Sequence, residues 1–296
     1  MPEIGVADGE SAAIRADHEE PAGLTPTTRR GRPTQLYMLA WRLVILAVFL
    51  SAWEYIPRIG GASSSIPLLN PVFISSPSKI AVTLFNLAFA RAGEPLVWPY
   101  LEETILAAVL GSVLGLLLGA LFGLLLSNYP TMSDVIQPFV VAANSIPRIA
   151  LIPIVILVAG PGRAAAVINA VLVVFFIGFF NAFEGGRSVP RAVWENAVLL
   201  GAGPIQLMWR IRREYAVIWT FAAIPNAVSF GLIAAVTSEI LTGSEGMGFL
   251  ITQSITNIDA SLGFAVIVLL SAVGIVLTIG SERLRWRLMR WRQYEV

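Results

Sequence analysis

Few side chains in this chain are suited to binding an ion or moving a proton, and the most conspicuous of them lie inside apolar stretches. Charged and amide groups are costly in lipid, so they are expected to face the interior of a helix bundle or an aqueous cavity. We predict that these residues line a route for a polar solute, although Arg148 and Glu239 are equally well explained as a structural ion pair. The predicted route residues are Asn144, Arg148, Asn226, Ser238 and Glu239.

The residue types that common catalytic sites require are missing or misplaced. The chain has no cysteine, which excludes disulfides and thiol chemistry. Its one histidine, His18, lies in a polar stretch near the N-terminus, so we expect no histidine triad and no metal site in the membrane. Its one lysine, Lys79, has no glycine-rich loop before it, which excludes a Walker A phosphate loop. We therefore predict no catalytic residue, no metal and no cofactor, and an intramembrane enzyme would have few groups to use.

The composition predicts an all-α integral membrane protein. The chain is 56% hydrophobic and 13% charged, whereas soluble domains carry about 25% charged residues. A net charge of +1 gives no reason to expect nucleic acid as a partner. Six apolar segments approach or exceed the about 20 residues that cross a bilayer core. These predicted spans are residues 36–56, 105–126, 139–159, 164–183, 216–241 and 262–279.

Two of the predicted spans carry internal signals. The third is irregular, because Pro147 and Pro153 interrupt the backbone hydrogen bonding of a helix and the freed groups must be satisfied within the protein or by water. The second has a glycine at every fourth position, which places a smooth stripe on one face and predicts close packing against another helix. The stripe consists of Gly111, Gly115, Gly119 and Gly123.

The remaining segments are predicted to lie outside the bilayer. Residues 1–34 are polar and are expected to be a disordered cytoplasmic tail, while residues 283–296 form a basic cytoplasmic tail that contacts anionic membrane lipid. Between them, residues 35–282 form the six-span domain. Its outer loop, residues 57–100, contains a helix start at Ser76 and Pro77 and a stop at Gly93. An interfacial helix and an irregular loop explain this loop equally well.

Residues 187–213 form the only long polar interruption in the apolar second half of the chain. Pro190 suits the first turn of one short helix, Gly201 can take the left-handed conformation that ends it, and Pro204 opens a second. A compact helical segment between two spans predicts a docking surface, and the alternative is an ordinary amphipathic loop.

Positive charge predicts the orientation. With both termini in the cytoplasm, 15 of the 20 basic residues lie inside, Arg148 lies within a span, and four lie outside. The opposite orientation would violate the positive-inside rule. We therefore predict a multi-pass protein of a prokaryotic cell membrane with loop 187–213 in the cytoplasm. The four outside residues are Arg58, Lys79, Arg91 and Arg163.

Glu195, Asn196 and Ala197, followed by Gly201, resemble the E-A-A-x-x-x-G loop of the inner-membrane permeases of ABC importers. Asn196 departs from that pattern, and Arg213 and Glu214 stand where the family often has Leu and Pro. The two-proline third span, and Glu239 followed by Gly246 and Gly248, resemble the same family. The resemblance spans residues 73–282, roughly, and is to the branch that transports nitrate, sulfonates and taurine.

This resemblance implies a type I ABC importer permease fold and a chain that is not itself an enzyme. The loop would be the coupling helix, which sits in a groove of a dimeric ATPase that binds ATP and magnesium. A second permease chain, identical or related, and an extracytoplasmic substrate-binding protein would complete the importer of a small anionic solute such as a sulfonate, taurine or nitrate. The alternative is a secondary transporter or channel without an ATPase, for which internal repeats would be expected. The coupling residues would be Trp194, Glu195, Asn196, Ala197, Gly201 and Ala202.

Overall fold

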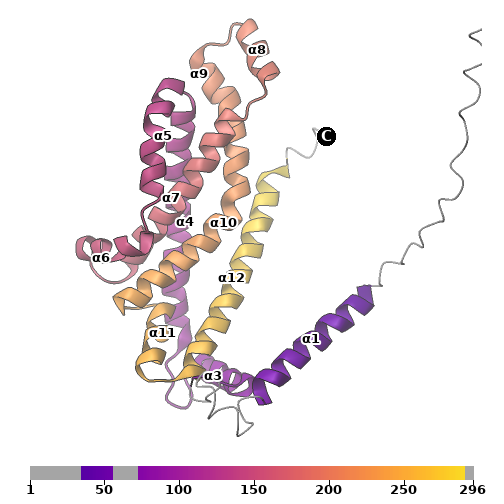
Figure 1. The fold of residues 1–296 in the computed structure, drawn as a ribbon, viewed down its shortest axis with the longest axis vertical. Helices are drawn as coiled ribbons and strands as arrows, with labels where there is room; N and C mark the ends of the chain where they lie inside the picture. Colours follow the sequence, from indigo (N-terminus) through magenta and orange to yellow (C-terminus); the bar gives the residue numbers. More distant parts are fainter. Residues whose placement is uncertain (1–34, 56–72, 291–296) are drawn as a thin grey trace, which may run out of the picture. The chain divides into compact units, whose positions relative to one another are not determined.

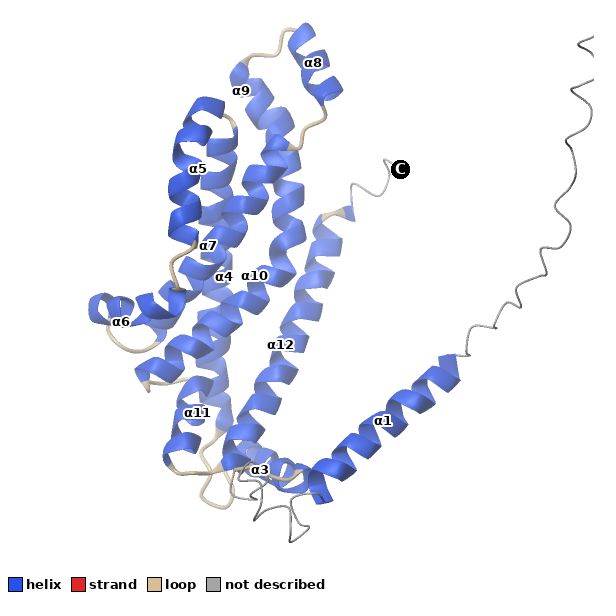
Figure 2. Ribbon diagram, viewed as in Figure 1, coloured by secondary structure: helices blue, strands red, loops and turns tan. Residues whose placement is uncertain are grey.

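The computed structural model describes residues 35–55 and 73–290, and within these ranges every regular element is a helix (Figures 1 and 2). The chain divides after Leu50 into two units. The first unit holds most of α1 (Gln35–Tyr55), whose stretch Tyr37–Tyr55 is long and apolar enough to cross a bilayer. Residues 1–34, 56–72 and 291–296 lie outside the described ranges, so the predictions for the tail and for the start of the outer loop remain predictions.

The second unit contains four further helices of membrane-spanning length. Their apolar stretches satisfy the length requirement of a bilayer core, and with α1 they make five candidate spans among the described residues. All four run beyond the predicted bounds, most of all α4, which begins eight residues before Ile105, and α12, which continues nine residues past Ile279. The four are α4 (Val97–Ser127), α7 (Arg163–Arg187), α10 (Arg213–Thr242) and α12 (Ala260–Leu288).

The predicted third span, residues 139–159, is interrupted as its prolines predicted, and it falls on two helices. The chain forms α5 (Pro130–Asn144) and α6 (Arg148–Ala159), which meet at 86°. Pro147 causes the break, because it has no N–H to continue the hydrogen bonding of α5 and restricts the residue before it. Counted as one bent span, α5 and α6 bring the candidate spans to six.

The glycine stripe of α4 faces α7. A β-carbon on Gly119 would lie 2.0 Å from the carbonyl oxygen of Phe175, and one on Gly123 would lie 2.3 Å from that of Phe179. Because backbone atoms occupy this space, a side chain here would push the two helices apart. The same contact includes Gly111 against Ala170 and Gly115 against the carbonyl of Val171.

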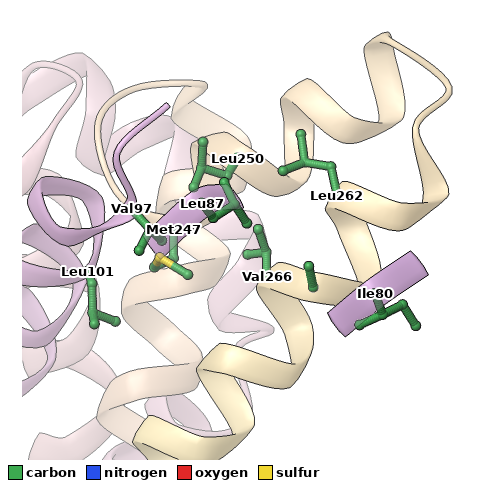
Figure 3. Close-up of a cluster of buried hydrophobic side chains, with 9 residues drawn as sticks. Ile80, Leu87, Val97, Leu101, Met247, Leu250, Leu262 and Val266 are labelled. Atoms are coloured by element: carbon green, nitrogen blue, oxygen red, sulfur yellow. The ribbon is translucent and has the colours of Figure 1, made fainter. Parts of the chain in front are cut away.

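A buried apolar cluster closes one end of this unit, and Figure 3 shows its side chains. It joins α3 (Pro77–Phe89), the start of α4, α11 (Met247–Thr256) and α12. The helix α3 begins after Ser76 as predicted, with Ile80 and Leu87 buried, but it ends at Ala90 in a left-handed conformation rather than at Gly93. The short helix α11 was not predicted. We call this end of the bundle the α11 end.

The opposite end carries the polar interruption and is called the α8 end. Here α8 (Arg191–Leu199) follows Pro190 directly, and α9 (Pro204–Leu207) leads through a π-helical turn (Met208–Arg212) into α10. Between α8 and α9, Gly201 has a φ of +82°, a conformation that favours glycine. The C-terminal end of α12 returns to this same end of the bundle (Figure 1).

Candidate functional site

The α8–α9 segment, residues 188–207, presents large apolar side chains to the outside. No residue of α8 is buried. Leu199 and Leu200 are 83% and 88% exposed, and Ile205 is similarly open. Soluble surfaces rarely gather exposed apolar side chains in this way unless another protein covers them. The segment therefore has the character of a docking surface.

Trp194 anchors the segment to the bundle. The guanidinium of Arg212 lies 4.5 Å from the centre of the Trp194 ring, a cation–π contact. The same guanidinium donates to the carbonyl of Ser127 and to Oδ1 of Asn128, at the end of α4. Arg212 thus connects α8 directly to the turn between α4 and α5. The sequence reasoning missed this residue, because its hydrogen-bond acceptors, Ser127 and Asn128, lie more than 80 positions away.

The other predicted coupling residues lie on the same exposed segment. Glu195 accepts a hydrogen bond of 2.6 Å from Arg191, one turn earlier, and both side chains are open to solvent. Such a pair contributes only a few tenths of a kcal/mol. The amide of Ala202 donates to the carbonyl of Ala197 and closes the helix end around Gly201. Asn196 is exposed. Contact of these residues with an ATPase remains a prediction.

The predicted route residues do not form one cluster. Asn144 and Arg148 lie together at the break between α5 and α6, where Nη2 of Arg148 donates to Oδ1 of Asn144. The Arg148 guanidinium also lies 5.4 Å from the centre of the Phe176 ring on α7. Its Nε is buried and has no hydrogen-bond partner within the described ranges. The alternative prediction, an ion pair between Arg148 and Glu239, is wrong in this conformation.

Glu239 has other partners, at the α11 end. The residue is 3% exposed, and its Oε2 accepts hydrogen bonds from the Thr104 hydroxyl at 2.8 Å and from the Gly248 amide at 3.0 Å. The Thr104 oxygen in turn accepts from the amide of Met247 at 2.8 Å. A β-carbon on Gly246 would lie 2.3 Å from Cδ of Glu239. Glu239 therefore holds the turn between α10 and α11 against α4.

The last two route candidates differ in exposure. Ser238 is fully buried, and its hydroxyl has no partner among the residues that the structure describes. Asn226 is exposed on α10, directly after Pro225. Their place on a solute route remains a prediction.

An apolar cavity of 520 Å³ lies between α4, α5 and α7. Phe176, over which Arg148 lies, also lines this cavity. The sequence reasoning missed it, although α7 carries five phenylalanines, and three of them, Phe175, Phe176 and Phe179, lie at helical spacing and could have indicated an aromatic face. The aromatic lining consists of Phe122, Tyr129, Phe139, Phe175, Phe176 and Phe179.

Acidic groups gather at the α11 end. Burial, and then the nearby Asp259, raise the pKa of Glu94 above its ordinary value. Glu103 of α4 forms an ion pair with Arg163 of α7. Within the described ranges, no group of three or more His, Cys, Asp or Glu side chains is arranged to hold a metal ion.

Comparison with known proteins identifies sequence similarity over most of the chain. The family described as the binding-protein-dependent transport system inner membrane component matches residues 111–290. A protein of Haemophilus influenzae, named a probable ABC transporter permease protein, is 28% identical over 84% of this chain and 95% of its own length.

Relatives with named solutes differ from one another. The riboflavin transport system permease protein RibX of Chloroflexus aurantiacus is 28% identical, over 90% of this chain and 97% of its own. SsuC of Bacillus subtilis, named for the transport of aliphatic sulfonates, is 25% identical over 84% of this chain and 87% of its own.

Among solved structures, the MetNI methionine ABC transporter in inward facing conformations is similar with a TM-score of 0.55. The identity is 18%, over 62% of this chain and 92% of the compared chain. This likeness concerns the fold alone.

Proposed function

This chain belongs to the family of binding-protein-dependent transport system inner membrane components, the inner-membrane permeases of ABC importers, and from this premise we propose how it couples ATP hydrolysis to uptake. The predicted family and the type I permease fold are thereby confirmed. We propose that the α8–α9 segment docks in a groove of a cytoplasmic ATPase. The observation that carries this proposal is the set of exposed apolar side chains on the α8–α9 segment, which is held to the bundle through Trp194 and Arg212.

The coupling would pass through two connections. One is covalent, because the π-helical turn continues α9 directly into α10. The other is the Arg212 guanidinium, which joins α8 to the α4–α5 turn. An ATPase that closes on ATP would move α8, and both connections would pass the displacement to the spans. An equilibrium shifts only as far as the differential binding free energy allows, so a rigid attachment transmits more of it.

The assembly would contain more than this chain. One chain offers one docking segment, whereas two ATPase subunits must close together, so a second permease chain, identical or related, is required. An extracytoplasmic binding protein would deliver the solute. In this arrangement the α8 end faces the cytoplasm and the α11 end faces outward, with ATP and magnesium bound by the ATPase alone.

For the solute we propose a small anion with an apolar body, an aliphatic sulfonate or a related compound such as taurine. Nitrate has no apolar body and would be bound through its negative charge alone. Arg148 and Asn144 supply a cationic and a polar group at the break between α5 and α6, and Arg148 lies over Phe176, which lines the aromatic cavity. A charged group near an apolar surface suits such a molecule. Because one relative is named for riboflavin and another for sulfonates, the identity of the solute is the part of the proposal that needs a direct test. We expect hexanesulfonate to compete for uptake, Arg148→Gln to weaken that competition at least tenfold, and Arg148→Lys to weaken it less. Uptake of riboflavin with no competition by sulfonates would overturn the solute assignment.

The docking proposal is tested by co-purification from the native membrane. We expect the wild-type chain to retain an ATPase and the double variant Leu199→Asp, Leu200→Asp to lose it. Ile255→Asp is the matched control, since Ile255 is an exposed apolar residue of α11 at the opposite end. Retention of the ATPase by the double variant would refute docking through α8.

A further inference from the structure

A second cavity, of 310 Å³, lies at the root of the α8–α9 segment. It is walled by the end of α4, the start of α5, the end of α7, α8 and the π-helical turn. Three arginines and two serines line it, and no carboxylate does. The residues that matter are Ser127, Ser133, Arg187, Arg191, Trp194 and Arg212.

The positive charges around this cavity are only partly compensated. Arg191 is paired with Glu195, outside the lining. Arg212 donates to backbone and amide oxygens of the α4–α5 turn, and Arg187 lies over the ring of Phe183; neither forms an ion pair with a carboxylate in the part of the chain that the structure describes. Arg187 and Arg212 also repel each other electrostatically. An anion in the cavity would relieve that repulsion.

A buried hydroxyl group supplies an independent observation. Ser133 is 2% exposed, lines the cavity, and its Oγ has no hydrogen-bond partner among the described residues. Buried hydroxyls are normally satisfied, so an unpartnered one at a cavity wall points to a ligand that the protein binds there. Ser127 Oγ already donates to the carbonyl of Leu124 and remains free to accept.

We propose that this cavity binds a phosphate-type anion, either the headgroup of an anionic phospholipid or free phosphate. Guanidinium groups match the geometry of phosphate oxygens and bind them through paired, charge-assisted hydrogen bonds. The aromatic cavity lies close to this one along the chain. Leu126 and Met132 line the aromatic cavity, and the residues that directly follow them, Ser127 and Ser133, line this one. A bound anion bridges α7, α8 and the π-helical turn to the α4–α5 turn, and so stiffens the root of the segment.

The test measures binding to the purified full chain in a neutral detergent at constant ionic strength. The probes are inorganic phosphate, dihexanoyl phosphatidylglycerol below its micelle concentration, and zwitterionic dihexanoyl phosphatidylcholine. We expect a saturable rise in Tm with phosphatidylglycerol, with phosphate, or with both, and none with phosphatidylcholine. A rise with phosphatidylglycerol alone assigns the site to a lipid headgroup, and a rise with phosphate as well assigns it to the phosphoryl group itself.

Two variants connect this binding to the cavity. The double variant Arg187→Gln, Ser133→Ala removes one exposed charge and one hydroxyl, and we expect its affinity for the anion to fall about tenfold or more. Arg210→Gln removes an exposed arginine of the π-helical turn that does not line the cavity, and its affinity should match that of the wild type.

Three results would overturn the assignment. These are no saturable rise with any anion, an equal rise with phosphatidylcholine, and equal affinity in the double variant and the wild type. If no anion binds and Arg187→Gln instead releases the ATPase, the cavity receives a carboxylate of that protein and the phosphate assignment is wrong.

Discussion

The two ends of the helix bundle differ in how well they bury their own apolar side chains. At the α11 end, Leu87, Met247 and Leu250 are fully enclosed, and the carboxyl group of Glu239 is fixed by Thr104 and the Gly248 amide. At the α8 end, Leu199 and Leu200 are open, and α8 buries none of its residues. The comparison indicates that one end maintains the shape of the bundle by itself, whereas the other leaves apolar side chains open, where we propose that a partner docks.

The same helices join both ends. α10 begins next to Arg212 and carries Glu239 in its last turn, while α4 begins near Thr104 and ends at Ser127, which accepts from Arg212. Between the ends, the glycine stripe presses α4 against α7. A displacement at the α8 end can therefore reach the α11 end through packed, continuous helices.

The largest effect on stability is expected from a side chain that separates α4 from α7. Gly119→Leu should prevent recovery of folded protein, and Gly119→Ala should destabilise by about 1–3 kcal/mol through overpacking, because its β-carbon would meet the backbone of Phe175. Gly280→Ala on α12 is the control: nothing lies within 4 Å of its β-carbon, so better helix propensity should leave it neutral or slightly more stable. Thermal unfolding in detergent measures the stability of Gly119→Ala and Gly280→Ala, and the yield of folded protein measures the effect of Gly119→Leu. A normal yield of folded Gly119→Leu would contradict the packing account.

Next in size is damage to the α11 end alone. Thr104→Val removes one donor to the Glu239 carboxyl group and the acceptor of the Met247 amide, so we expect a loss of about 1.5–3 kcal/mol. Thr237→Val is the matched control, since the Thr237 hydroxyl bonds only within its own helix. Equal stability of the two variants would show that the Glu239 cluster does not hold this end together. ATPase retention should be normal in both.

At the α8 end the expected effect is on coupling rather than on stability. Gly201→Val must place a branched side chain at a φ of +82°, which costs about 1–2 kcal/mol locally and distorts the turn between α8 and α9. We expect ATP-driven uptake to fall severalfold more than membrane yield. Gly203→Ala, whose φ is −74° and whose β-carbon meets nothing, should transport normally. Full uptake by Gly201→Val would remove the coupling role of this turn.

The smallest effect concerns pH and the α11 end. A carboxyl group whose pKa is higher in the folded state makes folding less favourable as the pH rises above its unfolded value, about 4.3 for Glu. Burial and Asp259 raise the pKa of Glu94 in this way. Glu94→Gln should therefore flatten the fall of Tm with rising pH, measured by thermal unfolding at a series of pH values above about 4. An unchanged slope in Glu94→Gln would show that this group does not contribute.

What the sequence predicted well was local or periodic. Long apolar runs predicted the spans, the four-residue glycine spacing predicted a close helix contact, and Gly201 predicted the break between α8 and α9. These features depend on neighbours along the chain, so a single sequence contains them. Pro147 was noticed, but its consequence, two helices at 86°, depends on how α6 packs beside α7.

What the sequence could not predict depended on partners far along the chain. The Glu239 carboxyl accepts from Thr104, 135 residues earlier, and Arg148 instead donates to Asn144, so the alternative of an ion pair between them is not realised. Arg212 was counted only as a positive charge, yet its contacts with Trp194 and Ser127 attach α8 to the bundle. No spacing rule connects such positions, because the helix packing that brings them together is itself the product of the fold.

The most direct test of the account measures solute accumulation in sealed vesicles. Vesicles that contain this chain with its partner permease, ATPase and binding protein should accumulate solute only when ATP is present on the side of the ATPase. Vesicles that contain the chain without the ATPase should accumulate none, with or without an ion gradient. Accumulation against a gradient in the absence of the ATPase would contradict the claim that this chain draws its energy through the α8–α9 segment.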